Sequence, residues 1–365
     1  MQRTKKRGCG RNCGISIPYF NFGACPNPKQ NSSMYTKRNY DFWMTFNWSR
    51  RPFFIALLYA LPITALSHFT GIDFSLPWQP ISVLGIAVAF YLGFKNNSSY
   101  DRTWEARKIW GGIVNNSRTF GAALNSFIQT RDKTEDLKIR QRLIYRHIAW
   151  LTALRYQLRL SRDWEHKEDR VKGLYSPTIC EEYFNNMDKE VMNLISEEEF
   201  ELYKPKANIA TQIMATQSRE LQALHDLGYF DGFRHVEFHR LIAEFYADQG
   251  RSERIKNFPF PRQYASVALW NTLVFAALLP WGLLSVFTED TDAWHIWLTV
   301  PFSGLITWVF FLMEKIGDYS ENPFEGTYND VPITSISRAI EIDLREMLGE
   351  TEVPKPIAAV DGFLM

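Results

Sequence analysis

Long apolar stretches without a charged residue constrain this chain more than any other feature. Residues 52–72, 264–287 and 294–313 contain no Asp, Glu, Lys or Arg. As helices they would each extend over about 30 Å, which matches the hydrocarbon core of a bilayer. A fourth stretch, residues 80–94, is equally uncharged but short for a helix that faces lipid. Charged residues make up 22% of the whole chain, so only part of it can be embedded in a membrane.

The distribution of basic residues indicates how many of these stretches cross the membrane. The loops 70–79 and 288–293 contain no Lys or Arg, whereas basic residues lie at the other end of every apolar stretch. Those basic residues are Arg50, Arg51, Lys95, Arg102, Arg107, Lys108, Arg251, Arg254, Lys256, Arg262 and Lys315. Because Lys and Arg collect on the cytoplasmic side, the pattern predicts four spans in two hairpins, with both termini in the cytoplasm. We expect the location to be the plasma membrane.

The remainder of the chain reads as a helical cytoplasmic body. Within residues 95–263, apolar residues recur at helical spacing over 101–127, 137–158, 197–203 and 209–227. A further helix is predicted over 332–349, with Gly349 as its C-cap. The predicted inward positions are Trp104, Ile109, Ile113, Phe120, Leu137, Ile144, Ile148, Leu151, Leu158, Ile333, Ile336, Ile340, Leu344 and Met347. Residues 34–350 are predicted to form one domain with a carboxyl-terminal segment at 321–350, between tails at 1–33 and 351–365.

One face of the short span carries an apolar stripe. Ile86, Phe90 and Phe94 follow one another at intervals of four residues, so a helix stacks them on one face. Ordinary helix packing would explain such a stripe, and Gly85 and Gly93 on other faces would suit close packing. A helix that lines a central pore is shielded from lipid, and apolar rings in a pore gate by dewetting. The short span is therefore predicted to line a pore, with these three residues as its neck, and to continue as a helix beyond Lys95.

A metal-dependent membrane enzyme is the alternative from another class of protein. His235 and His239 are one helical turn apart and would need a third ligand to bind zinc or iron. No zinc pattern is formed by Cys9, Cys13 and Cys25, and no hydrolase or nucleotide-binding motif is present. The acidic pair at 181–182 and the acidic run at 197–199 are predicted to be solvated helix ends. A net charge of +1 gives no attraction to nucleic acid, so we expect no nucleic-acid partner. From the motifs we also expect no metal site and no cofactor.

Two motifs resemble the bestrophin family of ion channels. The segment 93–111, GFKNNSSYDRTWEARKIWG, resembles the bestrophin segment that joins the pore helix to the cytoplasmic body. Bestrophins usually have Arg-Trp-Trp where this chain has Arg102, Thr103 and Trp104. The second motif is Asn322-Pro323-Phe324, followed by Asn-Asp-Val-Pro at 329–332 and the helix at 340–349, as in the bacterial branch. Together the motifs extend the resemblance over residues 34–350.

The resemblance implies an all-α homopentamer with four spans per subunit and an axial pore lined by the second span. Its neck falls on Ile86, Phe90 and Phe94, and a second, cytoplasmic constriction falls on Ile209 or Ile213. The permeant ions would be chloride or monovalent cations, with membrane lipid as the surrounding partner. Animal bestrophins are calcium-activated chloride channels with an acidic run after Asn-Pro-Phe. Here only Glu325 and Asp330 of that run are acidic, so calcium gating is not expected.

Overall fold

The computed structural model describes residues 34–35, 39–128, 132–166, 186–288, 294–327, 329–358 and 363–364. The predictions made for the tail 1–33, for residues 181–182 and for the loop 289–293 lie outside the described residues. Apart from one pair of two-residue strands, the described residues form helices, turns and irregular segments. The prediction of an all-α fold is therefore confirmed.

Within the described ranges, three helical stretches are long and apolar enough to cross a membrane. They are α1 (Phe42–Thr70), the stretch Gly232–Thr288, whose apolar part is α10 (Arg262–Thr288), and the stretch His295–Tyr319. The last begins with the short 3-10 helix η1 (His295–Leu298) and continues as α11 (Thr299–Tyr319). Gly71 ends α1 with a φ of +65°, a conformation that glycine adopts without strain. The chain is thus a helical membrane protein.

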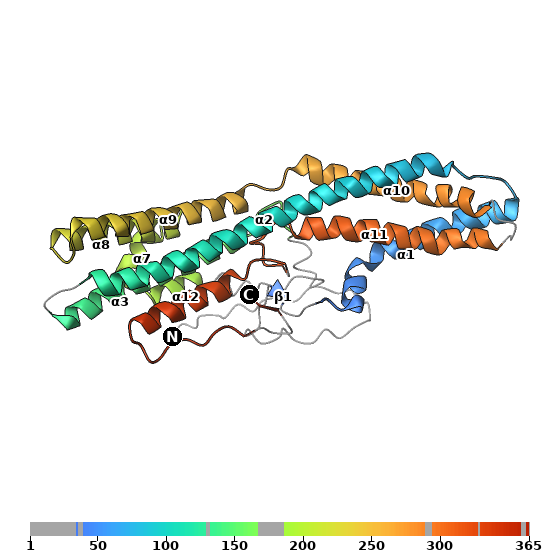
Figure 1. Cartoon of the computed structure of the whole chain (residues 1–365). Helices are drawn as coiled ribbons and strands as arrows, with labels where there is room; N and C mark the ends of the chain where they lie inside the picture. Colours follow the sequence, from blue (N-terminus) through green and yellow to red (C-terminus); the bar gives the residue numbers. More distant parts are fainter. Residues whose placement is uncertain are drawn as a thin grey trace, which may run out of the picture. The chain divides into compact units, whose positions relative to one another are not determined.

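The fourth apolar stretch is the beginning of α2 (Trp78–Phe127), a continuous helix of 50 residues. At 1.5 Å per residue it extends over about 75 Å, far more than the thickness of a bilayer. Figure 1 shows α2 alongside α10 and α11 in its first half, and alongside α9 and α12 in its second half. The predicted continuation of this span into the polar body is confirmed.

Among the residues that the structure describes, the body contains the second half of α2 and six further helices. These are α3 (Lys133–Arg159), α6 (Met187–Met192), α7 (Glu197–Tyr203), α8 (Ile209–Asp226), α9 (Gly232–Asn257) and α12 (Ile333–Met347). Side chains of Asp132, Ser196, Asn208 and Asp231 accept hydrogen bonds from backbone N–H groups in the first turns of α3, α7, α8 and α9. Gly349 follows α12 with a φ of +81°, as predicted for the end of that helix.

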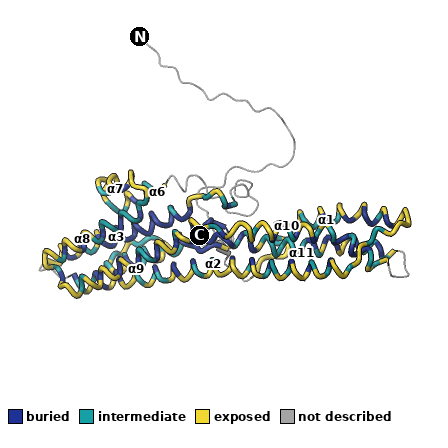
Figure 2. Tube along the Cα trace, turned by 90° about the horizontal axis from the view of Figure 1, so that it is seen from above, coloured by how far each residue is buried: buried dark blue, intermediate teal, exposed yellow. Residues whose placement is uncertain are grey.

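The two halves of α2 pack into separate apolar cores. In the first, Val88 and Leu92 pack against Phe275 and Leu279 of α10. Gly85 lies against Phe275, where a Cβ atom would be only 2.8 Å from the ring, so its predicted role in close packing is confirmed. Gly93 has no atom within 4 Å of its Cβ position and does not share that role. Dark blue segments in Figure 2 follow the inward faces of the helices.

The second core lies in the body and contains most of the predicted inward residues. Ile109, Ile113, Phe120, Ile144, Ile148, Leu151, Leu158, Ile333, Ile340 and Leu344 are all buried there. Trp104 and Leu137 were predicted to point inward, and these predictions are wrong, because both are exposed. Met347, the last residue of α12, is partly exposed, but its sulfur lies only 2.9 Å from the Cβ position of Gly121 on α2.

The two ends of the described chain meet in a strand pair. β1 (Met34–Tyr35) pairs antiparallel with β2 (Phe363–Leu364), so that Met34 lies opposite Leu364. Residues 351–365 were predicted as a tail, yet Glu352 is already bound to the body, since its carbonyl accepts a hydrogen bond of 2.9 Å from Arg345.

Candidate functional site

An exposed apolar stripe runs along the first half of α2. Val83, Ile86, Phe90 and Phe94 are 65%, 71%, 68% and 59% exposed, although all lie within the most apolar part of the helix. The rings of Phe90 and Phe94 touch edge to face, with centroids 4.7 Å apart. The opposite face of the same helix is packed, with Leu92 fully buried. No part of the described chain therefore covers this stripe.

The stripe continues in polar residues past Phe94. Asn97, Asp101 and Lys108 are exposed at helical spacing, and Trp104 is 48% exposed with its ring stacked on Tyr100. Trp104 follows Ile86 by about five turns, which places both on one face of a straight α-helix. The same uncovered face thus changes from apolar in the membrane half to polar and aromatic in the body.

Arg102 ties α2 to two other parts of the subunit. Its guanidinium donates hydrogen bonds to the carbonyl oxygens of Ile255 at 3.0 Å and Phe258 at 2.9 Å, at the end of α9. It also donates to the carbonyl of Glu321 at 2.8 Å, just after α11. The carbonyl of Ile255 lies in the last turn of α9, which ends at Asn257, and Phe258 and Glu321 follow the ends of α9 and α11, so none of the three is in a position to accept a hydrogen bond from a residue four positions further along a helix. The motif residue Arg102 therefore fixes the point where the membrane half joins the body.

The second motif forms a buried turn at the same junction. Phe324 is 1% exposed and belongs to the core of the body. The amide of Asn322 donates to Glu325 at 3.4 Å, and the carbonyl of Pro323 accepts a hydrogen bond of 3.1 Å from the N–H of Val331. The motif therefore folds the acidic run back on itself and brings Glu325 and Asp330 inside.

Both carboxylates of that run are bound by basic groups of the same chain. Glu325 accepts hydrogen bonds from the backbone N–H of His166 at 2.6 Å and from its Nδ1 at 3.1 Å. The other ring nitrogen, Nε2, lies 2.8 Å from Asp318. Burial alone would lower the pKa of His166, but Asp318 and Glu325 outweigh it and raise this pKa to about 10. His166 is therefore a cation held between two carboxylates.

Asp330 is bound by Arg159 from the end of α3. Arg159 Nη1 lies 3.0 Å from Asp330 Oδ2, and Nη2 donates to the carbonyl of Val331 at 3.1 Å. The hydroxyl of Thr327 donates to the other oxygen of Asp330 at 2.7 Å, and the N–H of Gly326 also donates to this carboxylate. Both charged side chains are almost fully buried. An isolated buried charge is costly, so this pair depends on its mutual contact.

Further buried ion pairs surround this junction and were not found from the sequence. Lys95, where the apolar stretch of α2 ends, is 2% exposed and lies 2.8 Å from Glu314 near the end of α11. Lys256 pairs with Glu165, and both side chains are buried. The sequence could have indicated that Lys95 is paired, because a charged residue beside an apolar stretch requires a partner. The sequence did not reveal which partner.

The structure separates the two candidates for a second constriction. Ile213 is fully buried in the core of the body and presents no surface from this subunit. Ile209, the first residue of α8, is only partly buried and packs at the edge of that core.

The acidic run at 197–199 is not a fully solvated helix end. Glu199 binds Arg146 through both oxygens, at 2.6 and 3.0 Å, and accepts a hydrogen bond of 2.6 Å from Tyr203. Burial tends to raise the pKa of Glu199, but the contacts with Arg146 and Tyr203 lower it overall. Arg146 is 4% exposed, so the body requires this carboxylate to compensate its charge.

The two histidines of the enzyme alternative do not form a site together with a carboxylate. His235 packs with its ring centroid 5.0 Å from that of His225, and burial followed by the neighbouring histidines lowers its pKa. Within the described ranges no group of three or more His, Cys, Asp or Glu side chains could hold a metal ion.

The fold and the uncovered stripe define a helical membrane protein in which one face of α2 is apolar and is not covered by the described chain. Sequence comparison then identifies the family: the chain belongs to the bestrophins, because the model described as Bacterial/Fungal Bestrophin protein matches residues 49–346. The resemblance noted from the two motifs is thereby confirmed. The enzyme alternative has no support from any relative.

Named relatives and solved structures agree with this family. A voltage-dependent anion channel-forming protein of Mesorhizobium japonicum is 28% identical over 305 residues, which cover 83% of this chain and 85% of the relative. YneE of Escherichia coli K12, also named a voltage-dependent anion channel-forming protein, is 28% identical over 306 residues, covering 84% and 86%. The crystal structure of a bacterial bestrophin homolog from Klebsiella pneumoniae has a TM-score of 0.68 at 22% identity, covering 82% of this chain and 98% of that one. It shows the same fold.

Proposed function

We propose that this protein is a subunit of an anion channel in the plasma membrane, with the exposed stripe of α2 lining an axial pore. The observation that carries the proposal is the stripe itself, since four large apolar side chains are left uncovered opposite a fully packed face. The named functions of the Mesorhizobium and Escherichia relatives favour anions. Monovalent cations are the competing permeant ions, because an apolar neck carries no charge that selects a sign.

In this proposal α2 supplies the fourth span, and both termini lie in the cytoplasm. Its apolar stretch is too short for a helix that faces lipid, but neighbouring subunits would shield this stretch from lipid. Ile86, Phe90 and Phe94 form the neck, where a narrow dry passage opposes ion entry. Ile209 at the start of α8 is the candidate for the cytoplasmic constriction, because Ile213 is enclosed in the core.

Reversal potentials of the purified protein in planar bilayers test the ion sign. Under a potassium chloride gradient, we expect the current to reverse close to the equilibrium potential of chloride. Replacing chloride with a large organic anion should move the reversal potential, whereas replacing potassium with a large organic cation should not. A reversal potential that follows potassium would contradict the proposal of an anion channel.

The oligomeric state is a separate prediction. A single α2 stripe cannot enclose a pore, and closed cyclic symmetry would place each stripe on a common axis. Five subunits are the number that the resemblance to bestrophins implies. Native mass spectrometry in mild detergent should give a species of five times the subunit mass. A distribution of monomers and dimers only, in a sample that still conducts, would contradict it.

Calcium should have little effect on the current. A calcium site requires six or more oxygen ligands, whereas Glu325 and Asp330 are bound by His166 and Arg159. We expect the same bilayer current in chelator and in micromolar calcium, with magnesium as a matched divalent control. Reversible switching of the current by calcium alone would show that these carboxylates exchange their protein partners for the ion.

A further inference from the structure

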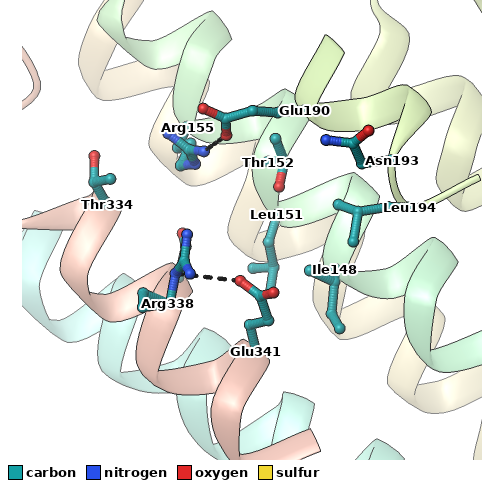
Figure 3. A pocket seen from close by; sticks show the side chains of 11 residues that line it. Ile148, Leu151, Thr152, Arg155, Glu190, Asn193, Leu194, Thr334, Arg338 and Glu341 are labelled. Carbon is teal, nitrogen blue, oxygen red and sulfur yellow. Dashed lines mark hydrogen bonds and ion pairs between the residues drawn. The ribbon is translucent and has the colours of Figure 1, made fainter. Parts of the chain in front are cut away.

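A cavity of about 280 Å³ lies in the body between α3, α6 and α12. Figure 3 shows side chains from these three elements pointing into it. Its volume is at the low end of the range for small-molecule sites, which is about 300–1,000 Å³. The cavity therefore suits a metabolite of a few heavy atoms rather than a nucleotide.

Two pairs of opposite charge lie on different walls of this cavity. Arg155 of α3 binds Glu190 of α6, and Glu190 also accepts a hydrogen bond of 2.8 Å from Tyr156. On α12, Arg338 Nε lies 3.3 Å from Glu341 Oε2, and Arg345 Nη1 lies 3.4 Å from the other oxygen of Glu341. Figure 3 draws both contacts as dashed lines. The walls thus supply two cations and two anions, and their charges balance.

The cavity also has uncharged polar and apolar surfaces. Ile148 and Leu151, almost fully buried in α3, form an apolar part of the lining. Thr152, Asn193 and Ser337 add groups that hydrogen-bond without carrying charge. A concave site with apolar walls and a few directed polar groups is the usual form of a small-molecule site.

We propose that this cavity binds a small zwitterionic amino-carboxylate. A guanidinium has five N–H donors and binds carboxylates in pairs of parallel hydrogen bonds. Arg338 uses only Nε toward Glu341, which leaves its terminal nitrogens for a ligand carboxylate. Glu341 and Glu190 can then accept from the ligand's ammonium group. A ligand that carries both signs can share these contacts without adding a net charge to the cavity, whereas a ligand of one sign would add an uncompensated charge.

The position of α12 connects this site to the pore helix, a step that rests on the proposed channel function. Arg118 of α2 donates to Asp343 of α12 at 2.7 Å, and Asn125 of α2 donates to the carbonyl of Met347 at 2.9 Å. Gly121 allows close approach, because a Cβ atom there would lie 2.6 Å from Leu344. A ligand that holds α12 against α3 and α6 would therefore restrain α2, and we expect it to change the current.

Thermal unfolding of the full-length protein in detergent tests the binding without any need for ion flow. L-serine, L-aspartate and β-alanine at millimolar concentration are the probes, with acetate and ethylamine as controls of single charge. At saturation, we expect at least one probe to raise the melting temperature by about 2–4 °C. Arg338→Gln should weaken its binding by about tenfold or more. Arg240→Gln, which removes an exposed arginine paired with Glu237 at the same helical spacing, should leave binding unchanged.

Several outcomes would overturn the proposal. These are no melting shift with any of the three probes, an equal shift with acetate or ethylamine, and undiminished binding by both Arg338→Gln and Glu341→Gln. The second variant keeps the test decisive if one of the two does not fold. A bound probe that leaves the bilayer current of the wild type unchanged would overturn the connection to α2. Absence of any current would instead contradict the channel function, while the melting shift would still report on the cavity.

Discussion

Truncation of Phe90 or Phe94 to alanine is expected to increase the single-channel current while leaving assembly intact. Both side chains are more than half exposed in the subunit, so their removal creates no cavity within it. If they face a pore, each truncation removes one ring from every subunit and widens a dry constriction. The barrier to ion dehydration then falls, and we expect the current to rise several-fold.

The matched control lies on the opposite face of the same helix. Leu92 is fully buried against α10, so Leu92→Ala should leave a cavity and cost about 2–5 kcal/mol per subunit. We expect lower yield and a lower melting temperature for this variant. For Phe90→Ala and Phe94→Ala, elution and melting temperature should match the wild type. A Phe variant that elutes normally and conducts no better than the wild type would show that the substituted residue is not part of the neck. A variant that fails to assemble would show that the substituted residue is a packing residue.

Helices could be predicted from the sequence because their pattern is local. The helix over 197–203 and the continuity of the second span with the body both follow from spacing and composition within short windows. The exposure of Trp104 shows how such a prediction fails. The inward face of residues 101–127 was predicted separately from that of residues 80–94. Counting turns from Ile86 along one continuous helix places Trp104 on the uncovered face. A prediction that followed the helix as one body would have placed it correctly.

The ion pairs at the junction could not be predicted, because their partners are far apart in sequence. Lys95 and Glu314 are separated by 219 positions, and Arg159 and Asp330 by 171. Periodicity shows which residues share a face of one helix, but it does not show which helices meet. The residues that we propose for the neck could be grouped from the sequence because they share one helix. The cations bound to Glu325 and Asp330 come from the end of α3 and the segment that follows it.

Replacing His166 with alanine should strongly destabilise the subunit. The ring lies between Asp318 and Glu325 and stacks on Tyr319, with centroids 4.4 Å apart. Its removal leaves the fully buried Glu325 without its cation, whereas the half-buried Asp318 keeps Lys95 at 3.7 Å. Removing one partner of a buried ion pair typically costs about 3–5 kcal/mol. We expect a clearly lower melting temperature in detergent, while His239→Ala, at an exposed histidine, should melt like the wild type.

The same contact predicts how stability depends on pH. The pKa of His166 rises from 6.5 in the unfolded chain to about 10 in the folded protein. Between these values the folded protein keeps a proton that the unfolded chain has lost, so raising the pH favours unfolding. The stabilisation is complete below about pH 6.5 and is lost as the pH rises toward 10. The difference in melting temperature between wild type and His166→Ala should therefore be largest at pH 6 and shrink steadily toward pH 10. A difference that stays constant over this range would show that His166 stabilises the junction by packing on Tyr319 and not by its charge.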